Sequence, residues 1–147
     1  IEDLGYGKGY VAALGHHRAL LGKLTQLKRE RGMACVLLAH SQVKRFEDPT
    51  TEAFDRFEIK LHRRASDLYT EFADVVGFAQ ARTTTKETTS SFGTKKIKAV
   101  GSGERVLRVA SRPNFVAKTR YQMPDELPLE WSALINAITG QQEKTDG

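Results

Sequence analysis

The chain has 147 residues, of which 39% are hydrophobic and 28% are charged. A chain of this length can bury one hydrophobic core, and the composition is that of a soluble globular domain rather than a disordered segment. No apolar stretch approaches the roughly 20 residues that a membrane-spanning helix needs, and the N-terminus has no secretory pattern. We therefore expect a cytoplasmic protein with no membrane partner.

The formal net charge is +5, but it is spread unevenly along the chain. Residues 82–120 carry +8, and the remainder of the chain carries −3. A mildly acidic body with one strongly basic segment is expected of a protein that binds a polyanion. A solvated hairpin kept soluble by lysine is the alternative, and composition leaves both open.

A helix is the first predicted element, over residues 11–31. Its leucines follow helical spacing, basic residues crowd its last turn, and Gly32 follows as a stop signal. The unbroken apolar run 34–39 then predicts a strand buried on both faces, as in a parallel sheet. We expect the lone cysteine, Cys35, to be buried in that strand.

Residues 43–57 predict a polar loop that contains Phe46, Phe54 and Phe57. An amphipathic helix is expected over residues 58–72, and residues 74–79 predict a second buried strand, parallel to the first. Helices alternating with strands are typical of an α/β sheet.

Beyond residue 79 the pattern changes to that of an antiparallel region. Residues 83–91 predict a mobile loop or hairpin tip, and strands are expected over 94–100, 105–110 and 114–121, with turns at 101–103 and 112–114. A short helix ending at Ile138 follows. We expect residues 1–139 to form a single domain and residues 140–147 to be a disordered tail.

The glycine-rich start, Gly5–Tyr10, does not match a phosphate-binding loop, because it lacks the spacing Gly-x-x-x-x-Gly-Lys-Ser/Thr. A flexible loop that feeds the first helix is the favoured interpretation. The single cysteine and the scattered histidines have no zinc-site spacing, so no metal site is expected. His40 and Ser41 are adjacent at the end of the predicted strand and would point to opposite faces, which does not favour hydrolase chemistry.

Gln42, directly after the first apolar run, is the first candidate site residue. Ligands of open α/β sheets bind beyond the carboxyl ends of the strands, and an amide there can hydrogen-bond a phosphate oxygen or an attacking water. An ordinary strand-end amide bonded to the backbone is the alternative. Lys118 and Arg120 are the second candidates, since residues i and i+2 of a strand share a face and paired cations can clamp a phosphoryl group. Two solvated cations on an edge strand are the alternative.

The chain resembles a family of phage nucleotide-binding proteins with a RecA-like core, encoded among phage recombination genes and linked to single-strand annealing. The resemblance extends to about Ile138. The segments that carry it are Gly5–Tyr10, Leu37–Asp48, the helix with Lys60-Leu61-His62, Phe72–Phe78, Gly101–Leu107 and Ala117–Pro128.

The resemblance implies the C-terminal part of a RecA-like P-loop ATPase core, with parallel strands and crossover helices followed by an antiparallel β-hairpin region. Gln42 corresponds to the phosphate sensor, and residues 43–57 to a DNA-contacting loop. Lys118 and Arg120 resemble the Lys-x-Arg finger that reaches a neighbouring subunit's ATP. The Walker A loop and Walker B aspartate of the family lie upstream of Gly5, so we expect these 147 residues alone to be inactive.

Single-stranded DNA and further copies of the chain, in a ring or filament, are the implied partners, and the host-cell cytoplasm is the implied location. ATP and Mg²⁺ are implied as cofactors of the full-length protein. The residues expected to contact DNA are Lys44, Arg45, Arg56, Lys95, Lys96 and Lys98. A nucleic-acid-binding module that uses residues 82–120 without ATP, and a scaffold with no ligand, remain as alternatives.

Overall fold

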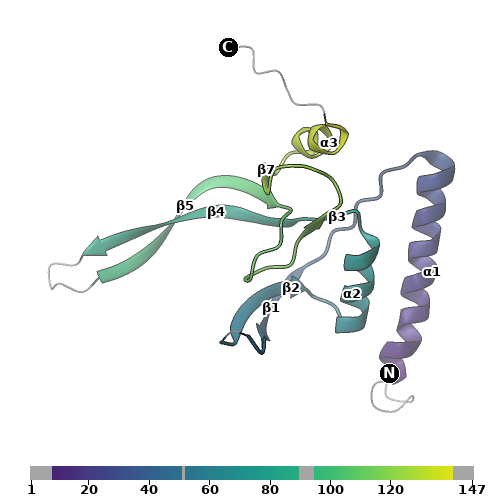
Figure 1. Ribbon diagram of the computed structural model, residues 1–147, viewed down its shortest axis with the longest axis horizontal. Coiled ribbons are helices and arrows are strands. Elements are labelled where there is room, and N and C mark those ends of the chain that lie inside the picture. Colours follow the sequence, from purple (N-terminus) through teal and green to yellow (C-terminus); the bar gives the residue numbers. More distant parts are fainter. Residues whose placement is uncertain (1–7, 51, 90–94, 141–147) are drawn as a thin grey trace, which may run out of the picture. The chain divides into compact units, whose positions relative to one another are not determined.

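The computed structural model describes the backbone of residues 8–50, 52–89 and 95–140, and the side chains of residues 9–50, 52–82 and 103–140. The glycine-rich start at residues 5–7 and the predicted tail beyond Gly140 lie outside the described residues. The elements form two compact units, residues 1–73 and 74–147, which are taken in turn. In chain order they are α1 (Lys8–Arg31), β1 (Ser41–Phe46), β2 (Phe54–Ile59), α2 (Arg63–Phe72), β3 (Val75–Val76), β4 (Phe78–Thr89), β5 (Lys95–Arg108), β6 (Lys118–Thr119), β7 (Glu126–Pro128) and α3 (Trp131–Thr139) (Figure 1).

The first unit is built on the contact between helices α1 and α2. Its buried apolar side chains in the described part are Leu14, Leu21 and Ala65. Two aromatic contacts join the helices and the residue before α2: the Tyr69 hydroxyl lies 3.0 Å from His17 Nδ1, and the Tyr10 ring stacks on His62. The predicted first helix is confirmed, and it ends at Gly32, whose φ of +61° lies in the left-handed region that favours glycine.

The predicted strand at 34–39 is wrong for the structure described. Residues 32–40 are irregular, and Val36, Leu37 and Leu38 are exposed, Leu38 by 95%. Cys35 is exposed as well, so its predicted burial is also wrong. An apolar run becomes a buried strand only where neighbouring strands supply hydrogen bonds and cover, and no described strand pairs with this segment.

The predicted polar loop at 43–57 is largely β-structure instead. Strand β1 pairs antiparallel with β2 in a two-stranded ribbon, and Phe46, Phe54 and Phe57 all belong to its strands. The second predicted helix begins later than expected, because residues 58 and 59 finish β2 and α2 starts at Arg63. The available hairpin signal was the turn pair Asp48-Pro49, which the loop prediction did not use. The flanking segments do not alternate, since Val43 and Phe46, like Phe54 and Phe57, are three residues apart.

The second unit contains only antiparallel pairs among its described strands, so the predicted parallel sheet is not found. β3 pairs with β6, and β4, β5 and β7 form a sheet in the order β4-β5-β7. The predicted strand at 74–79 is divided at Gly77, where the chain leaves the β3–β6 pair and enters β4. In Figure 1, β4 and β5 continue side by side as a long two-stranded ribbon.

Residues 101–103, predicted as a turn between two strands, lie inside one continuous strand, β5. Ala81 pairs with Arg105 and Thr83 with Gly101, so an irregularity in the register absorbs the intervening residues. Gly103 has a φ of +75°, which a bulge can use and an ordinary strand residue rarely adopts. Residues 83–89, expected in a loop, extend β4.

The core of this unit is formed by residues of β5 and β7 and of the segment between β5 and β6. Val106, Val109, Phe115, Ala117 and Leu127 are buried, and Phe78 stacks on Phe115 with ring centroids 5.0 Å apart. The predicted turn at 112–114 is confirmed by reciprocal backbone hydrogen bonds between Arg112 and Phe115. The predicted strand at 114–121 is reduced to the two residues of β6. The final short helix, α3, is confirmed.

Candidate functional site

The β1–β2 ribbon sorts several predicted site residues onto two faces. Residues directly opposite each other in an antiparallel pair share a face, and the register pairs Gln42 with Glu58, Lys44 with Arg56 and Phe46 with Phe54. These six residues therefore form one face, which we call the Lys44–Arg56 face. All six are partly buried.

The Lys44–Arg56 face brings two cations and two aromatic rings together. The Arg56 guanidinium lies over the Phe46 ring, 4.8 Å from its centroid, and Phe46 and Phe54 are tilted against each other with centroids 5.4 Å apart. Arg56 Nε is buried and has no hydrogen-bond partner among the described residues. Like charges directly opposite on a ribbon destabilise it unless something compensates them, and Glu58, the acidic residue of this face, leaves the face a net charge of +1. This arrangement can accept an anion, and its rings can stack on a planar group.

Arg45, the third predicted DNA contact in this ribbon, lies on the opposite face. Its guanidinium is 3.7 Å from the carboxylate of Asp55, with both side chains well exposed. Val43 and Phe57 are paired on the same face and are also exposed. The structure therefore separates Arg45 from Lys44 and Arg56.

Gln42 lies within β1 rather than beyond the end of a buried strand. Its Nε2 donates a hydrogen bond of 3.3 Å to the backbone carbonyl of Ile59. This is the bond that the ordinary strand-end alternative expected. Gln42 nevertheless shares a face with Lys44, which lies two residues further along β1. The Gln42 amide is therefore next to the position of Lys44 and Arg56 on this face.

Lys118 and Arg120 lie in the second unit, at strand β6 and the residue after it. Lys118 pairs with Val76 of β3. Arg120 is bound twice to Asp74: its backbone N–H donates to the Asp74 carbonyl at 3.0 Å, and its Nη1 lies 2.9 Å from the Asp74 carboxylate. Asp74 therefore fixes the Arg120 side chain at the start of the β3–β6 pair.

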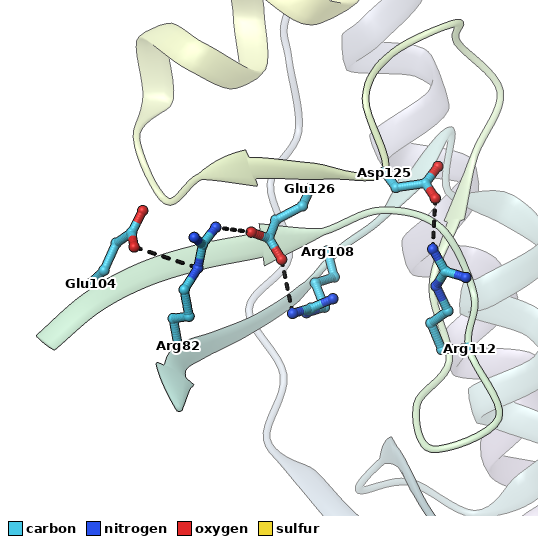
Figure 2. Close-up of polar contacts among 6 residues, drawn as sticks. All are labelled: Arg82, Glu104, Arg108, Arg112, Asp125 and Glu126. Carbon is cyan, nitrogen blue, oxygen red and sulfur yellow. Dashed lines mark hydrogen bonds and ion pairs between the residues drawn. The ribbon is translucent and has the colours of Figure 1, made fainter. Parts of the chain in front are cut away.

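Carboxylates neutralise much of the basic segment near β7, which sequence reasoning missed. Figure 2 shows Glu126 between Arg82 and Arg108, with Glu104 on the other side of Arg82 and a separate pair between Arg112 and Asp125. Asp74, Asp125 and Glu126 lie outside residues 82–120, so a charge count over that window omitted them. Arg82, Arg108, Arg112 and Arg120 are thus engaged within their own unit.

Lys95, Lys96 and Lys98 lie on β5, in the part of the ribbon beyond the register irregularity. The backbone register pairs Lys98 with Lys86, Lys96 with Thr88 and Lys95 with Thr89. The three predicted lysines are therefore divided between the two faces, with Lys96 and Lys98 on one and Lys95 on the other.

In the described part of the chain, no three His, Cys, Asp or Glu residues are grouped so as to hold a metal ion. No described helix is long and apolar enough to cross a membrane.

The family model described as an AAA domain matches residues 1–121. The chain belongs to the AAA domain family. AAA domains are nucleotide-binding domains of the ATPase type, and they generally bind ATP with Mg²⁺. No curated protein and no solved structure matches the chain.

The family match covers both groups of candidate residues in this AAA-family chain. Gln42, Lys44 and Arg56 lie within the matched segment, as do Lys118 and Arg120. Helix α3 lies beyond the matched segment, as do Asp125 and Glu126, whose carboxylates pair with arginines.

Proposed function

We propose that this chain is part of a phage RecA-like ATP-binding protein that acts on single-stranded DNA in recombination or annealing. Its membership of the AAA domain family supports the nucleotide-dependent half of this proposal. The observation that carries the DNA-binding half is the Lys44–Arg56 face, on which two opposed cations adjoin two aromatic rings.

The chemistry of that face fits a single strand. Lys44 and Arg56 neutralise backbone phosphates, and the buried Arg56 Nε gains an acceptor when a phosphate oxygen approaches. Phe46 and Phe54 stack on unpaired bases, each stack contributing about 1–3 kcal/mol. Duplex bases are already stacked on one another, so the rings give a preference for unpaired DNA.

Gln42 connects this face to the state of the nucleotide. Its hydrogen bond to Ile59 is long, at 3.3 Å, and it has a neutral amide that can bind a phosphate oxygen instead. When Gln42 exchanges this partner, β1 moves at a position two residues from Lys44. The movement displaces Lys44, the cation directly opposite Arg56. Phosphate sensing at Gln42 and DNA binding at Lys44 and Arg56 are thereby coupled through a single strand.

Lys118 and Arg120 act as a finger toward the ATP of a neighbouring subunit, which makes a homo-oligomer the active form. Asp74 orients the Arg120 guanidinium from within its own subunit. The printed sequence contains no Gly-x-x-x-x-Gly-Lys-Ser/Thr pattern, so ATP and Mg²⁺ are held mainly by residues outside it. When bound, Mg·ATP supplies the phosphoryl group on which Gln42, Lys118 and Arg120 act.

Replacing Gln42 with Ala in the full-length protein tests the coupling. We expect single-stranded DNA to bind with the same affinity whether or not ATP is present, whereas the unchanged protein binds more tightly in one nucleotide state. Gln122→Ala, at an exposed site in the second unit, is the matched control and should keep the nucleotide effect. A Gln42→Ala protein that retains the full nucleotide effect would exclude Gln42 as the sensor.

Mixing subunits tests the finger. Arg120→Ala and Lys118→Ala should each lower DNA-stimulated ATP hydrolysis by about 10³-fold, the lower end of what trans arginine fingers contribute, with nucleotide binding preserved. Mixing Lys118→Ala subunits with subunits that lack a functional Walker A lysine should restore part of the activity. Mixed oligomers that form and stay inactive would show that Lys118 does not act in trans.

A nucleic-acid-binding module that needs no ATP is the second candidate, and the lysines of the β4–β5 ribbon favour it. Absence of ATP hydrolysis and of any nucleotide effect in the full-length protein would select it.

A further inference from the structure

The β4–β5 ribbon segregates its charge between its two faces. The register of residues 83–89 with 95–101 pairs Lys86 with Lys98 and Thr88 with Lys96 on one face, which we call the lysine face. On the other face it pairs Glu87 with Ile97 and Thr89 with Lys95. The lysine face therefore carries three positive charges and no acidic residue at these register positions, and the other face has one charge of each sign.

Lysines that only protect exposed strand edges would not need to share a face. Here Lys86 and Lys98 are directly opposite in the register, and like charges at opposed positions destabilise a ribbon. Near β7 the same segment behaves differently, because Arg82 and Arg108 meet Glu104 and Glu126. The positive excess of residues 82–120 is thus concentrated on the outer lysine face.

We propose that the lysine face, Lys86, Lys96 and Lys98, is a second nucleic-acid contact, which binds backbone phosphates without reading sequence. Lys96 and Lys98 are two strand residues apart, about 7 Å, so the two lysines can contact different phosphates of one strand. Thr84 and Thr88 occupy the same face, and their residue type adds hydroxyl donors for phosphate oxygens.

The choice of nucleic acid as the polyanion rests on the proposed function. The lysine face extends that function by giving the protein a contact separate from the Lys44–Arg56 face. The two faces lie on different ribbons, so each can be removed while the other stays intact.

The test is the salt dependence of binding by the full chain to a fluorescently labelled oligothymidylate, without nucleotide. A Lys86→Gln/Lys96→Gln/Lys98→Gln variant should lower the slope of log K against log salt by about 2, at roughly 0.7 per lost single-strand phosphate contact. The control, Lys23→Gln/Lys28→Gln/Lys60→Gln, removes the same charge from exposed sites in the first unit. It should lower the slope by clearly less.

Equal slopes for the two triple variants would overturn the proposal. A Lys86→Arg/Lys96→Arg/Lys98→Arg variant should keep the slope of the unchanged protein, since it keeps the charges and the ribbon. Loss of the slope in that variant would also overturn the proposal. The assay contains no ATP, so it separates the two proposals. If the nucleotide tests fail, the lysine variant can still lower the salt slope. If the nucleotide tests succeed, the lysine variant can still leave the salt slope unchanged.

Discussion

Gly77 lies directly against the side chain of Leu107. A Cβ atom built on Gly77 would be 2.5 Å from Leu107 Cδ1 and 2.9 Å from Leu107 Cγ, closer than carbon atoms approach. Gly77 is also the single residue between β3 and β4, where the chain passes from one antiparallel pair to another. Glycine at this position therefore allows β4 to pack closely on β5.

Replacing Gly77 with Ala should destabilise the second unit by about 1–3 kcal/mol, because Leu107 or the strand must move to admit the methyl group. Urea unfolding followed through the fluorescence of Trp131, the single tryptophan, measures this. Gly22→Ala is the matched control, since Gly22 lies in α1 of the first unit with open space around it. It should leave the unfolding of the second unit, which Trp131 reports, unchanged. Equal midpoints for Gly77→Ala and the unchanged protein would contradict the close packing.

Glu126→Gln should destabilise the same unit by about 2 kcal/mol, because one carboxylate binds both Arg82 and Arg108. The Glu126 side chain is 24% exposed, so its charged hydrogen bonds are only partly screened. Asp125→Asn provides the comparison. The Asp125 side chain is 65% exposed and that of its partner Arg112 is 55% exposed, so this pair should contribute less than ~1 kcal/mol. Thermal melting of both variants tests the order, and a larger loss for Asp125→Asn would refute it.

Asp48 should titrate below its usual range. The Thr50 hydroxyl and then the Thr50 backbone N–H donate to its carboxylate, at 2.6 and 2.8 Å, and hold the pKa of Asp48 below the ordinary value of 3.8. Since the folded-state pKa is the lower one, this contribution to stability is present above pH 3.8 and is lost as the pH falls through the folded-state pKa.

Thr50→Val removes the hydroxyl donor and keeps the backbone donor, so it should raise the pKa of Asp48. Carbon-detected NMR titration of the Asp48 carboxylate measures the shift. Thr50→Ser retains a hydroxyl and should preserve the low pKa. An unchanged titration in Thr50→Val would assign the effect to the backbone hydrogen bond alone.

Arg56→Gln and Arg45→Gln remove the same charge from opposite faces of one ribbon. We expect Arg56→Gln to weaken single-stranded DNA binding by about 10-fold or more, because it loses a charged phosphate contact of roughly 1.5–3 kcal/mol. Arg45 is already paired with Asp55, so Arg45→Gln should cost much less. Fluorescence anisotropy with the full chain gives both affinities, and equal losses would show that the face does not matter.

The sequence predicted helices well, because their signals are local. The leucine spacing and Gly32 located α1 to within a few residues, and the predicted end of the last helix, Ile138, is one residue from the end of α3. The prediction of a buried strand over residues 34–39 failed because an apolar run favours burial alone. A strand also needs neighbouring strands to pair with, and no described strand pairs with this segment. Gly101 and Gly103 were read as a turn because glycine permits a turn and a bulge equally well.

The candidate site was predictable as a set of residue types but not as a set of contacts. The basic residues were visible in the sequence, yet the assignment of Lys44 and Arg56 to one face and Arg45 to the other depends on the β1–β2 register. The pairing of Arg120 with Asp74 joins residues far apart in the chain, which no local pattern reports. The turn pair Asp48-Pro49 was the available local signal for the ribbon.

The pairing of β3 with β6 has a consequence for the order of folding. β1–β2 and β5–β7 join segments that are close in sequence, whereas Val75 and Thr119 lie on either side of the whole β4–β5 ribbon. The entropy lost on closing a loop grows with its length, so the β3–β6 contact should form after the ribbon. In native-state hydrogen exchange, the Arg120 amide, which donates to Asp74, should therefore become accessible before the amide of Val109 in the buried core, which donates to Asp125.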